Sequence, residues 1–257
     1  MKPKLTITAS NRDRFDPDTN ATKLFVKSIQ WQTYKDFELL IADGGSKNYE
    51  EIKKYIENFN GDIPMRIVQF EIDLFSRSFL NNLGIRNAKG EYIATTDVDM
   101  LYDKYFVSEV MENAGRNVMI ESRTMYWKQP LVQRIYNGEL NPYTNIDDCK
   151  RGRIKKRTSA GGFQMMHIDS WQKLHAFDER YKVWGSEDYD LLLRAGKANI
   201  KVKWIGETID NIKLFHQPHL KKDIKMDLEW QKKNQKFLHN ITNFVANQDG
   251  YWGGIQD

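Results

Sequence analysis

The fold of this chain is indicated most strongly by the stretch Gly90-Glu91-Tyr92-Ile93-Ala94-Thr95-Thr96-Asp97-Val98-Asp99-Met100-Leu101. Its apolar and β-branched run over 92–96 predicts a buried strand, and the strand ends on two carboxylates, Asp97 and Asp99. Side chains at positions i and i+2 of an extended segment point the same way. Open α/β sheets bind ligands at the carboxyl ends of their strands. Two carboxylates there suit Mg²⁺ or Mn²⁺ carrying a diphosphate. The alternative is that the two aspartates only cap the strand and solvate a turn.

The composition is that of a soluble globular protein. The 257 residues are 40% hydrophobic and 29% charged, which fits one large α/β domain or one domain with an appendage. The net charge of +4 does not call for a nucleic-acid partner, although nucleotide phosphates or an anionic membrane surface are compatible with it. The sequence has one cysteine, Cys149, no apolar run of membrane-spanning length and no apolar signal region at its start. We therefore expect a cytosolic protein.

The chain before this stretch alternates strands and helices. The expected elements are a strand over 5–9, a helix over 21–32, a strand over 37–42, a helix over 49–59, a strand over 65–70 and a helix over 76–89. This is the parallel βαβ pattern of a nucleotide-binding half. A helix over 103–114 and strands over 118–122, 163–167 and 202–206 are expected to follow. Residues 122–157 are the least regular part, and we expect a long excursion over the substrate face.

Polar residues follow the other strands of this half as well. Ser10-Asn11-Arg12 ends the first strand, and Asp43-Gly44-Gly45-Ser46 ends the second. These groups either meet a ligand at the sheet edge or only form turns, and the residues alone favour neither. Arg77 begins the helix over 76–89, where an arginine can pair with phosphate but is otherwise a solvated surface residue.

A second informative stretch is Trp184-Gly185-Ser186-Glu187-Asp188. Ser186 is a candidate N-cap, and acids in a first helical turn are favoured by the helix dipole. Helix capping does not explain the preceding Trp184-Gly185 pair, whose indole provides a flat face for a sugar ring. A first-turn carboxylate beside it is a candidate general base for a hydroxyl.

Two features near the C-terminus remain open. His216 follows the apolar pair Leu214-Phe215, so it is favoured over His219 to face inward and complete a metal site. The stretch 221–244 predicts a basic amphipathic helix. It either packs its apolar side on the domain, which is the favoured interpretation, or lies peripherally on an acidic membrane surface at the inner face of the membrane.

In their order and spacing, these pieces resemble the GT-A glycosyltransferases over roughly residues 5–219. The chain is similar to family 2-like bacterial enzymes and to the galactosyl- and N-acetylgalactosaminyltransferase group with its Trp-Gly-x-Glu-Asp motif. The matching pieces are Asp43, the segment from Arg77 to Asp99, the segment from Trp184 to Asp188, and His216. Many relatives carry two acids where this chain has Asp43-Gly44. The resemblance implies a GT-A, Rossmann-like α/β fold with a mixed, mainly parallel sheet flanked by helices, and a C-terminal helical tail.

The resemblance also implies a division of the chain and a role for each site residue. Residues 1–220 would form the catalytic domain, with a nucleotide-binding half over about 1–101 and an acceptor-binding half over about 102–220, and 221–257 would be a C-terminal helical extension. The implied nucleotide- and donor-binding residues are Thr8, Ser10, Arg12, Asp43, Arg77, Asn81 and Asp97, with Asp43 reading the base, commonly uracil. The implied acceptor-binding residues are Trp184, Gly185 and Glu187. Asp99, Asp97 and His216 would hold Mn²⁺ or Mg²⁺, and Asp188, with Glu187 beside it, would be the catalytic base.

The activity that this resemblance implies is inverting, metal-dependent transfer of a sugar from a nucleoside-diphosphate sugar, commonly UDP-linked, to a hydroxyl of a glycan or glycolipid. Two rival functions stay open. A sugar-nucleotide nucleotidyltransferase also uses strand-end acids, but it usually has a Gly-rich basic loop where this chain has Ala9-Ser10-Asn11-Arg12. A non-catalytic carbohydrate-binding protein would keep Trp184 without needing the metal.

Overall fold

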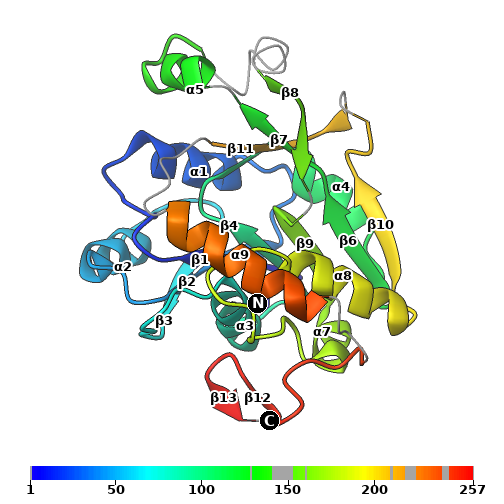
Figure 1. The fold of residues 1–257 in the computed structure, drawn as a ribbon. Helices are drawn as coiled ribbons and strands as arrows, with labels where there is room; N and C mark the ends of the chain where they lie inside the picture. The colour runs from blue at the N-terminus through cyan, green and yellow to red at the C-terminus, as the bar shows by residue number, and fades with distance from the viewer. Residues whose placement is uncertain are drawn as a thin grey trace.

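A seven-stranded sheet forms the centre of the computed structural model, which describes residues 2–127, 129–140, 153–159, 161–208, 211–217, 224–238 and 243–256 (Figure 1). In spatial order its strands are β10 (Lys201–Ile205), β6 (Val118–Ser122), β9 (Phe163–His167), β4 (Tyr92–Asp97), β1 (Leu5–Asn11), β2 (Phe37–Asp43) and β3 (Met65–Gln69). Of these seven strands, β9 alone is antiparallel to its neighbours. The expected mixed, mainly parallel α/β sheet is therefore confirmed.

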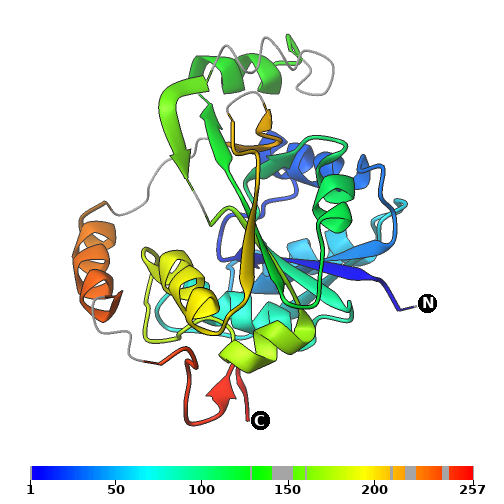
Figure 2. The same cartoon turned by 90° about the vertical axis from the view of Figure 1, so that its right-hand side faces the viewer.

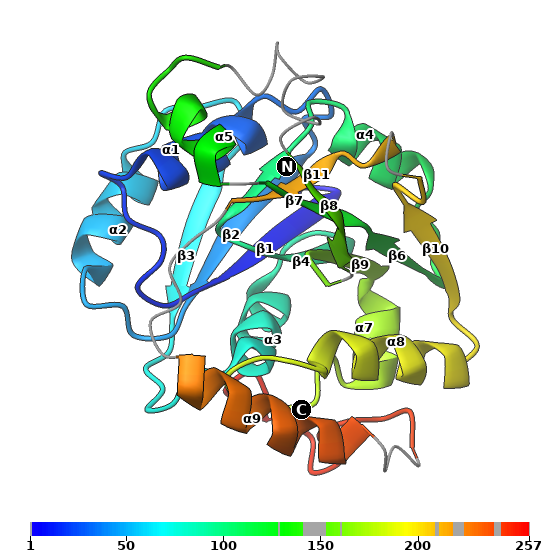
Figure 3. The same cartoon turned by 45° about the horizontal axis from the view of Figure 1, so that its top comes forward.

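Helices cover both faces of this sheet (Figure 3). One face carries α1 (Asn20–Gln30), α2 (Tyr49–Glu57) and α4 (Phe106–Glu112), and the other carries α3 (Arg77–Asn87), α7 (Ile168–Leu174) and α8 (Glu187–Lys197). Side chains alternate between the two faces along β1. Leu5, Ile7 and Ala9 pack in the first core cluster, with α1, α2 and α4, whereas Thr8 points to the opposite face and contacts α3. The expected helix over 103–114 is shorter than predicted, since α4 spans Phe106–Glu112.

A second sheet stands above the first and contains much of the stretch that looked least regular in the sequence (Figure 2). Its strands are, in order, β5 (Met100–Tyr102), β11 (Leu214–His216), β7 (Thr124–Trp127) and β8 (Arg153–Ser159), with α5 (Gln129–Tyr136) between β7 and β8. The excursion predicted over 122–157 is thus partly regular structure. Its segment 141–152, which includes Cys149, lies outside the described residues, as does His219.

The C-terminal part packs on the α/β fold. The helix α9 (Ile224–Leu238) contacts α8, and the ends of the helix predicted over 221–244 lie outside the described residues. A short hairpin of β12 (Tyr251–Trp252) and β13 (Ile255–Gln256) follows. The Arg86 guanidinium lies 3.5 Å from the Trp252 ring centroid, which joins this hairpin to the last turn of α3. None of the described helices is long and apolar enough to cross a bilayer.

Candidate active site at the carboxyl edge of the sheet

The two acids that end the β4 stretch face different partners. Asp97 is the last residue of β4, but Val98 and Asp99 form a turn before β5 begins at Met100. The strand β5 leaves for the second sheet, where it pairs with β11. The chain is not extended between the two acids, so the i, i+2 geometry on which we based their convergence does not apply, and a shared ligand stays a prediction.

Asp99 meets His216 instead. The pairing of β5 with β11 places His216 opposite Met100, and the His216 Nε2 atom lies 3.7 Å from Oδ1 of Asp99. Oδ2 of Asp99 lies 3.6 Å from Arg14 Nη1, and the His216 ring stacks on Tyr126 with centroids 4.8 Å apart. Asp99 and His216 are 15% and 16% exposed, so both are held in place while remaining open to a ligand.

This pair fits a divalent cation as two of its ligands. Donor atoms that share one cation at about 2.1 Å lie at most about 4.2 Å apart, and the Asp99–His216 separation is within that limit. Mg²⁺ and Mn²⁺ commonly take only one or two carboxylates and fill their remaining positions with substrate phosphates and water. Within the described part of the chain, no three His, Cys, Asp or Glu side chains form a complete metal cluster. The predicted triad is thus reduced to Asp99 and His216.

Asp97 belongs to a second cluster, which is centred on Arg77. The Nε atom of Arg77 donates to Oδ1 of Asp97 at 2.8 Å, while Nη1 donates to Oδ1 of Asp188 at 2.6 Å and to Glu187 at 3.2 Å. The Nη2 atom donates to the carbonyl of Gly161 at 2.7 Å and faces Oδ2 of Asp97 at 3.5 Å. One guanidinium therefore ties the end of β4 to the first turn of α8.

The same contacts leave Arg77 no donor for a phosphate. A guanidinium has five N–H donors, and the partners of Arg77 occupy all of them. The side chain is 8% exposed, and the three acids around it raise its pKa further above the ordinary value. The expectation of an arginine that binds the donor is corrected here to an arginine that holds the carboxylates.

Asp188 has the electrostatics of a general base. Burial raises its pKa to about 7, and Glu187 and Asp97 act in the same direction, while Arg77 opposes them. Its side chain remains 26% exposed, so a substrate hydroxyl can reach it. A base with a pKa near the working pH is both ionised and a good proton acceptor.

Gly161 fits closely against this base. Its φ is +88°, a conformation that favours glycine, and a Cβ atom at this position would collide with Oδ2 of Asp188. The space beside Gly161 is taken by the Asp188 side chain.

Glu121 lies behind Gly161 and was missed by the sequence analysis. It is fully buried on β6, and burial raises the pKa of its carboxyl to about 8. The backbone N–H of Gly161 is within hydrogen-bonding reach of this carboxyl, and Gln164 Nε2 donates to its Oε1 at 2.6 Å. Gln164 also lies 3.5 Å from the backbone oxygen of Asp188. The strand Val118–Ser122 was predicted, but nothing in its sequence distinguishes this glutamate from an ordinary one.

Two residues predicted to bind the nucleotide, Asp43 and Arg12, form hydrogen bonds within the protein. Asp43 is fully buried and accepts hydrogen bonds from Asn11 Nδ2 at 2.7 Å, Ser46 N at 2.8 Å and Gly45 N at 3.0 Å. Its carboxylate therefore shapes the turn after β2. Arg12 donates to the carbonyl oxygen of residue 72 at 2.8 Å and so anchors the loop that follows β3.

Three further residues of the predicted donor site are buried, as Asp43 and Arg77 are. Thr8 is fully buried beneath α3, where a Cβ on Gly84 would collide with its hydroxyl, so it does not reach the edge. Asn81 is also fully buried, and neither amide atom has a hydrogen-bond partner among the described residues. Ser10 is nearer the edge and 7% exposed.

The segment from Trp184 to Asp188 has an unusual backbone. Ser186 occupies the N-cap position of α8, but its φ is +72° and its side chain makes no capping bond, contrary to expectation. Glu187 is buried, and its carboxylate accepts from the backbone N–H of Gly185. The Trp184 side chain, which precedes this turn, is half-buried.

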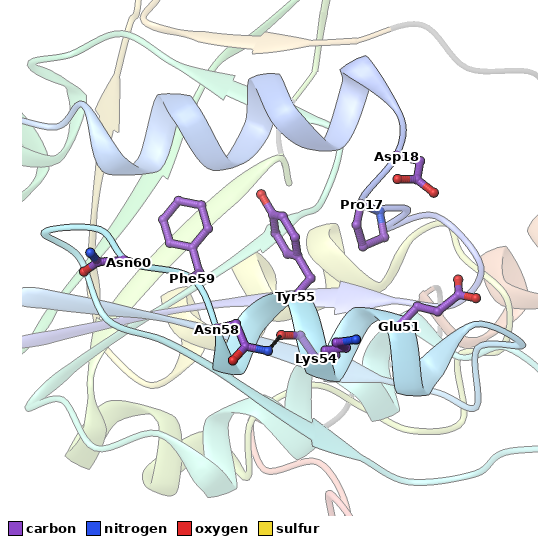
Figure 4. Close-up of a pocket in the computed structure, with 8 residues that line it drawn as sticks. All are labelled: Pro17, Asp18, Glu51, Lys54, Tyr55, Asn58, Phe59 and Asn60. Carbon is purple, nitrogen blue, oxygen red and sulfur yellow. Dashed lines mark hydrogen bonds between the residues drawn. The ribbon is translucent and has the colours of Figure 1, made fainter.

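An open groove lies apart from these residues. It has a volume of about 510 Å³ and runs between the loop before α1 and the helix α2, where the rings of Tyr55 and Phe59 lie 5.7 Å apart (Figure 4). The lining contains none of the predicted site residues.

Two family models match the chain. Residues 20–172 match glycosyl transferase family 2, and residues 142–219 match the N-terminal domain of galactosyltransferase. The chain is 23% identical to a hyaluronan synthase of Pasteurella multocida over 234 residues, which is 78% of this chain but 23% of that protein. The chain thus spans about a quarter of that relative.

Solved structures show the same fold. TarS of S. aureus in complex with UDP-GlcNAc aligns with a TM-score of 0.58 at 13% identity, over 85% of this chain and 60% of that one. The mannosyltransferase PcManGT of Pyrobaculum calidifontis, in complex with GDP-Man and Mn²⁺, also aligns with a TM-score of 0.58 at 13% identity, over 93% and 63% of the two chains. With more than half of its residues matched by the family 2 model, and with a central sheet of the expected kind, this chain belongs to glycosyl transferase family 2.

Proposed function

We propose that this chain is a metal-dependent, inverting glycosyltransferase. It moves a sugar from a nucleoside-diphosphate sugar, with uridine as the expected nucleoside, to a hydroxyl of a glycan or glycolipid. The observation that supports this most is the juxtaposition of two sites at one sheet edge. The proposed base, Asp188, is partly exposed and is held by Arg77 beside Asp97. Asp97 is two residues from the metal-binding candidate Asp99.

The reaction needs one proton transfer and one displacement. The ionised carboxylate of Asp188 takes the proton of the acceptor hydroxyl as its oxygen attacks the anomeric carbon. The bond from that carbon to the diphosphate breaks on the opposite face, so the configuration inverts and the electron pair leaves on the diphosphate. A cation held by Asp99 and His216 would supply Lewis-acid neutralisation of that diphosphate.

The acceptor is assigned to the face lined by Trp184 and Glu187. The indole is half-buried and offers an apolar face to a sugar ring. Glu187 is already engaged with Arg77 and the Gly185 amide. We therefore propose that Glu187 mainly holds Asp188 in position and that it also contacts the acceptor hydroxyls.

Two solved structures with this fold carry different nucleosides. TarS was solved with a uridine nucleotide and PcManGT with a guanosine nucleotide, and the two align equally well with this chain. Uridine is the nucleoside that we propose from the resemblance at Asp43, the last residue of β2. To meet a base, the Asp43 carboxylate would have to release hydrogen bonds that it now accepts from Asn11 and Ser46.

Calorimetric titration of UDP with Mn²⁺, and then with a chelator, tests the donor site. We expect binding that requires the metal and is lost in Asp99→Ala.

The variant Asp188→Asn tests the base. It should bind UDP with unchanged affinity while its transfer rate falls by about 10²- to 10⁴-fold, the usual contribution of a general base. The exposed Asp169→Asn is the control for removing one negative charge. Equal loss of binding and transfer in Asp188→Asn would overturn the base assignment. Binding of GDP but not UDP would change the nucleoside, and binding of neither would favour a non-catalytic carbohydrate-binding protein.

A further inference from the structure

The helix α9 contacts the acceptor motif from outside the two family matches. Those matches end at residues 172 and 219, whereas α9 spans Ile224–Leu238. Figures 1 and 3 both show α9 running past α3 and α8, where the loop before α8 lies. Its central residue in this contact is Asn234, which is fully buried.

Asn234 bonds the backbone of the acceptor loop, which we define as residues 181–186. Its Nδ2 atom donates to the carbonyl oxygens of Lys182 at 2.9 Å and Trp184 at 3.2 Å. Its Oδ1 atom faces the backbone N–H of Lys182 at 3.4 Å. All of these contacts go to main-chain atoms, so they recognise the shape of the loop rather than the side chains it carries.

The acceptor loop has a backbone that needs such support. Val183 has a φ of +58° and Ser186 a φ of +72°, and between them Gly185 has a φ of +107°. A β-branched residue in the left-handed region is a true outlier. Each such residue costs on the order of 1–3 kcal/mol and persists only where the surroundings determine it.

The opposite side of the acceptor loop is held by the start of α3. The Val183 N–H donates to the carbonyl of Phe75 at 2.8 Å, and the Arg77 N–H donates to the carbonyl of Val183 at 3.2 Å. The Ser76 hydroxyl donates to the carbonyl of Tyr181 at 3.0 Å. The loop is therefore fixed between Arg77, which holds Asp188 by its side chain, and Asn234 of the C-terminal helix.

We propose that Asn234 is a positioning residue for the acceptor site, an inference that rests on the proposed function. By bonding the Trp184 carbonyl, Asn234 fixes the peptide group between Trp184 and Gly185. The N–H of that peptide group, which belongs to Gly185, donates to the Glu187 carboxylate. The C-terminal extension thereby completes the acceptor side of the active site and leaves the donor side, at Asp99 and His216, untouched.

The first test is hydrogen exchange of the full chain, which needs no activity. In Asn234→Ala we expect the amides of the acceptor loop to exchange at least about tenfold faster, since losing about 1.4 kcal/mol of hydrogen bonding corresponds to that factor. The neighbouring Gln235→Ala is the matched control, because it removes an exposed amide side chain from the same helix. Unchanged exchange in the acceptor loop of a folded Asn234→Ala protein would overturn the proposal. Should that variant not fold, Asn234→Ser, which keeps a short polar group, replaces it.

The second test separates the two substrates. We expect Asn234→Ala to raise the KM for the acceptor and lower kcat, each about tenfold, with the Mn²⁺-dependent UDP affinity within about twofold of the parent. An equal loss of UDP affinity, or an unchanged acceptor KM beside faster exchange, would contradict a role in the acceptor site. If the parent protein transfers no sugar, the proposed function fails on its own, while the exchange result still decides whether Asn234 orders the loop.

Discussion

The Arg77 guanidinium lies 2.6 Å from the Asp188 carboxylate, although the two residues are 111 positions apart in the chain. Arg77 begins α3 beside the ends of β1 and β4, and Asp188 lies in the first turn of α8. Neither helix moves independently at this end while the contact holds. Arg77 therefore positions the proposed base and Asp97 together, and under the proposed function this would couple the acceptor side of the site to the donor side.

We expect Arg77→Lys to lower kcat by about 10²-fold with little change in UDP affinity. A lysine keeps the charge but offers three donors on a flexible stem, so it cannot hold three carboxylates and a carbonyl in one plane. Steady-state kinetics and UDP calorimetry measure the two effects. Arg180→Lys is the matched control, because the Arg180 side chain pairs with a single carboxylate, Asp178, and is itself two-thirds exposed. A variant with near-normal kcat but weak UDP binding would show that Arg77 serves the donor after all.

The pH dependence of transfer should follow Asp188. Its pKa is raised to about 7, so the ionised form that accepts a proton is lost as the pH falls through that value. We expect kcat/KM to increase with pH and to reach half of its upper level near pH 7 at saturating Mn²⁺. A rate that is constant between about pH 6 and 8 would contradict the assignment.

Glu121 should make the protein less stable as the pH rises. Its folded pKa is about 8 against an ordinary value of 4.5, so between these values the folded state holds a proton that the unfolded state has lost. The free energy of unfolding then falls by about 1.4 kcal/mol per pH unit from this group alone. Its contribution is complete below pH 4.5 and gone above pH 8.

Urea unfolding of Glu121→Gln at several pH values measures this contribution. Glutamine keeps the oxygen that accepts from Gln164 but cannot ionise, so the stability of the variant relative to the parent should rise steadily up to about pH 8. The exposed Glu112→Gln should show no such trend. Parallel curves for Glu121→Gln and the parent would mean that the buried carboxyl is already ionised at low pH.

The sheet was largely predictable because its signals are local. Runs such as Phe37–Asp43 and Tyr92–Asp97 carry the composition of buried strands, and the turn residues after them mark the functional edge. The position of Asp99 was not predictable in the same way. The i, i+2 rule holds only while a strand continues, and the turn at Val98–Asp99 sends the second acid toward His216.

The contacts that organise the site could not be inferred from spacing. Arg77 meets Asp188 across 111 residues, and Asn234 meets Trp184 across 50. Long-range contacts of this kind follow from how helices pack on the sheet, which a single sequence does not record. Glu121 is a further example, because its unusual pKa comes from burial by neighbours that are distant in the chain.

The antiparallel direction of β9 makes the position of Gly161 depend on the register of one pair of strands. Because β9 starts where its neighbour β4 ends, one ladder, in which Thr96 pairs with Phe163, sets how far Gly161 extends toward Asp188. A slip of that ladder by one residue would turn Gln164 to the other face of the sheet and withdraw the glycine from the base. The same slip would take Phe163 and Met165 out of the first core cluster, so the packing that stabilises the sheet also fixes the geometry beside Asp188.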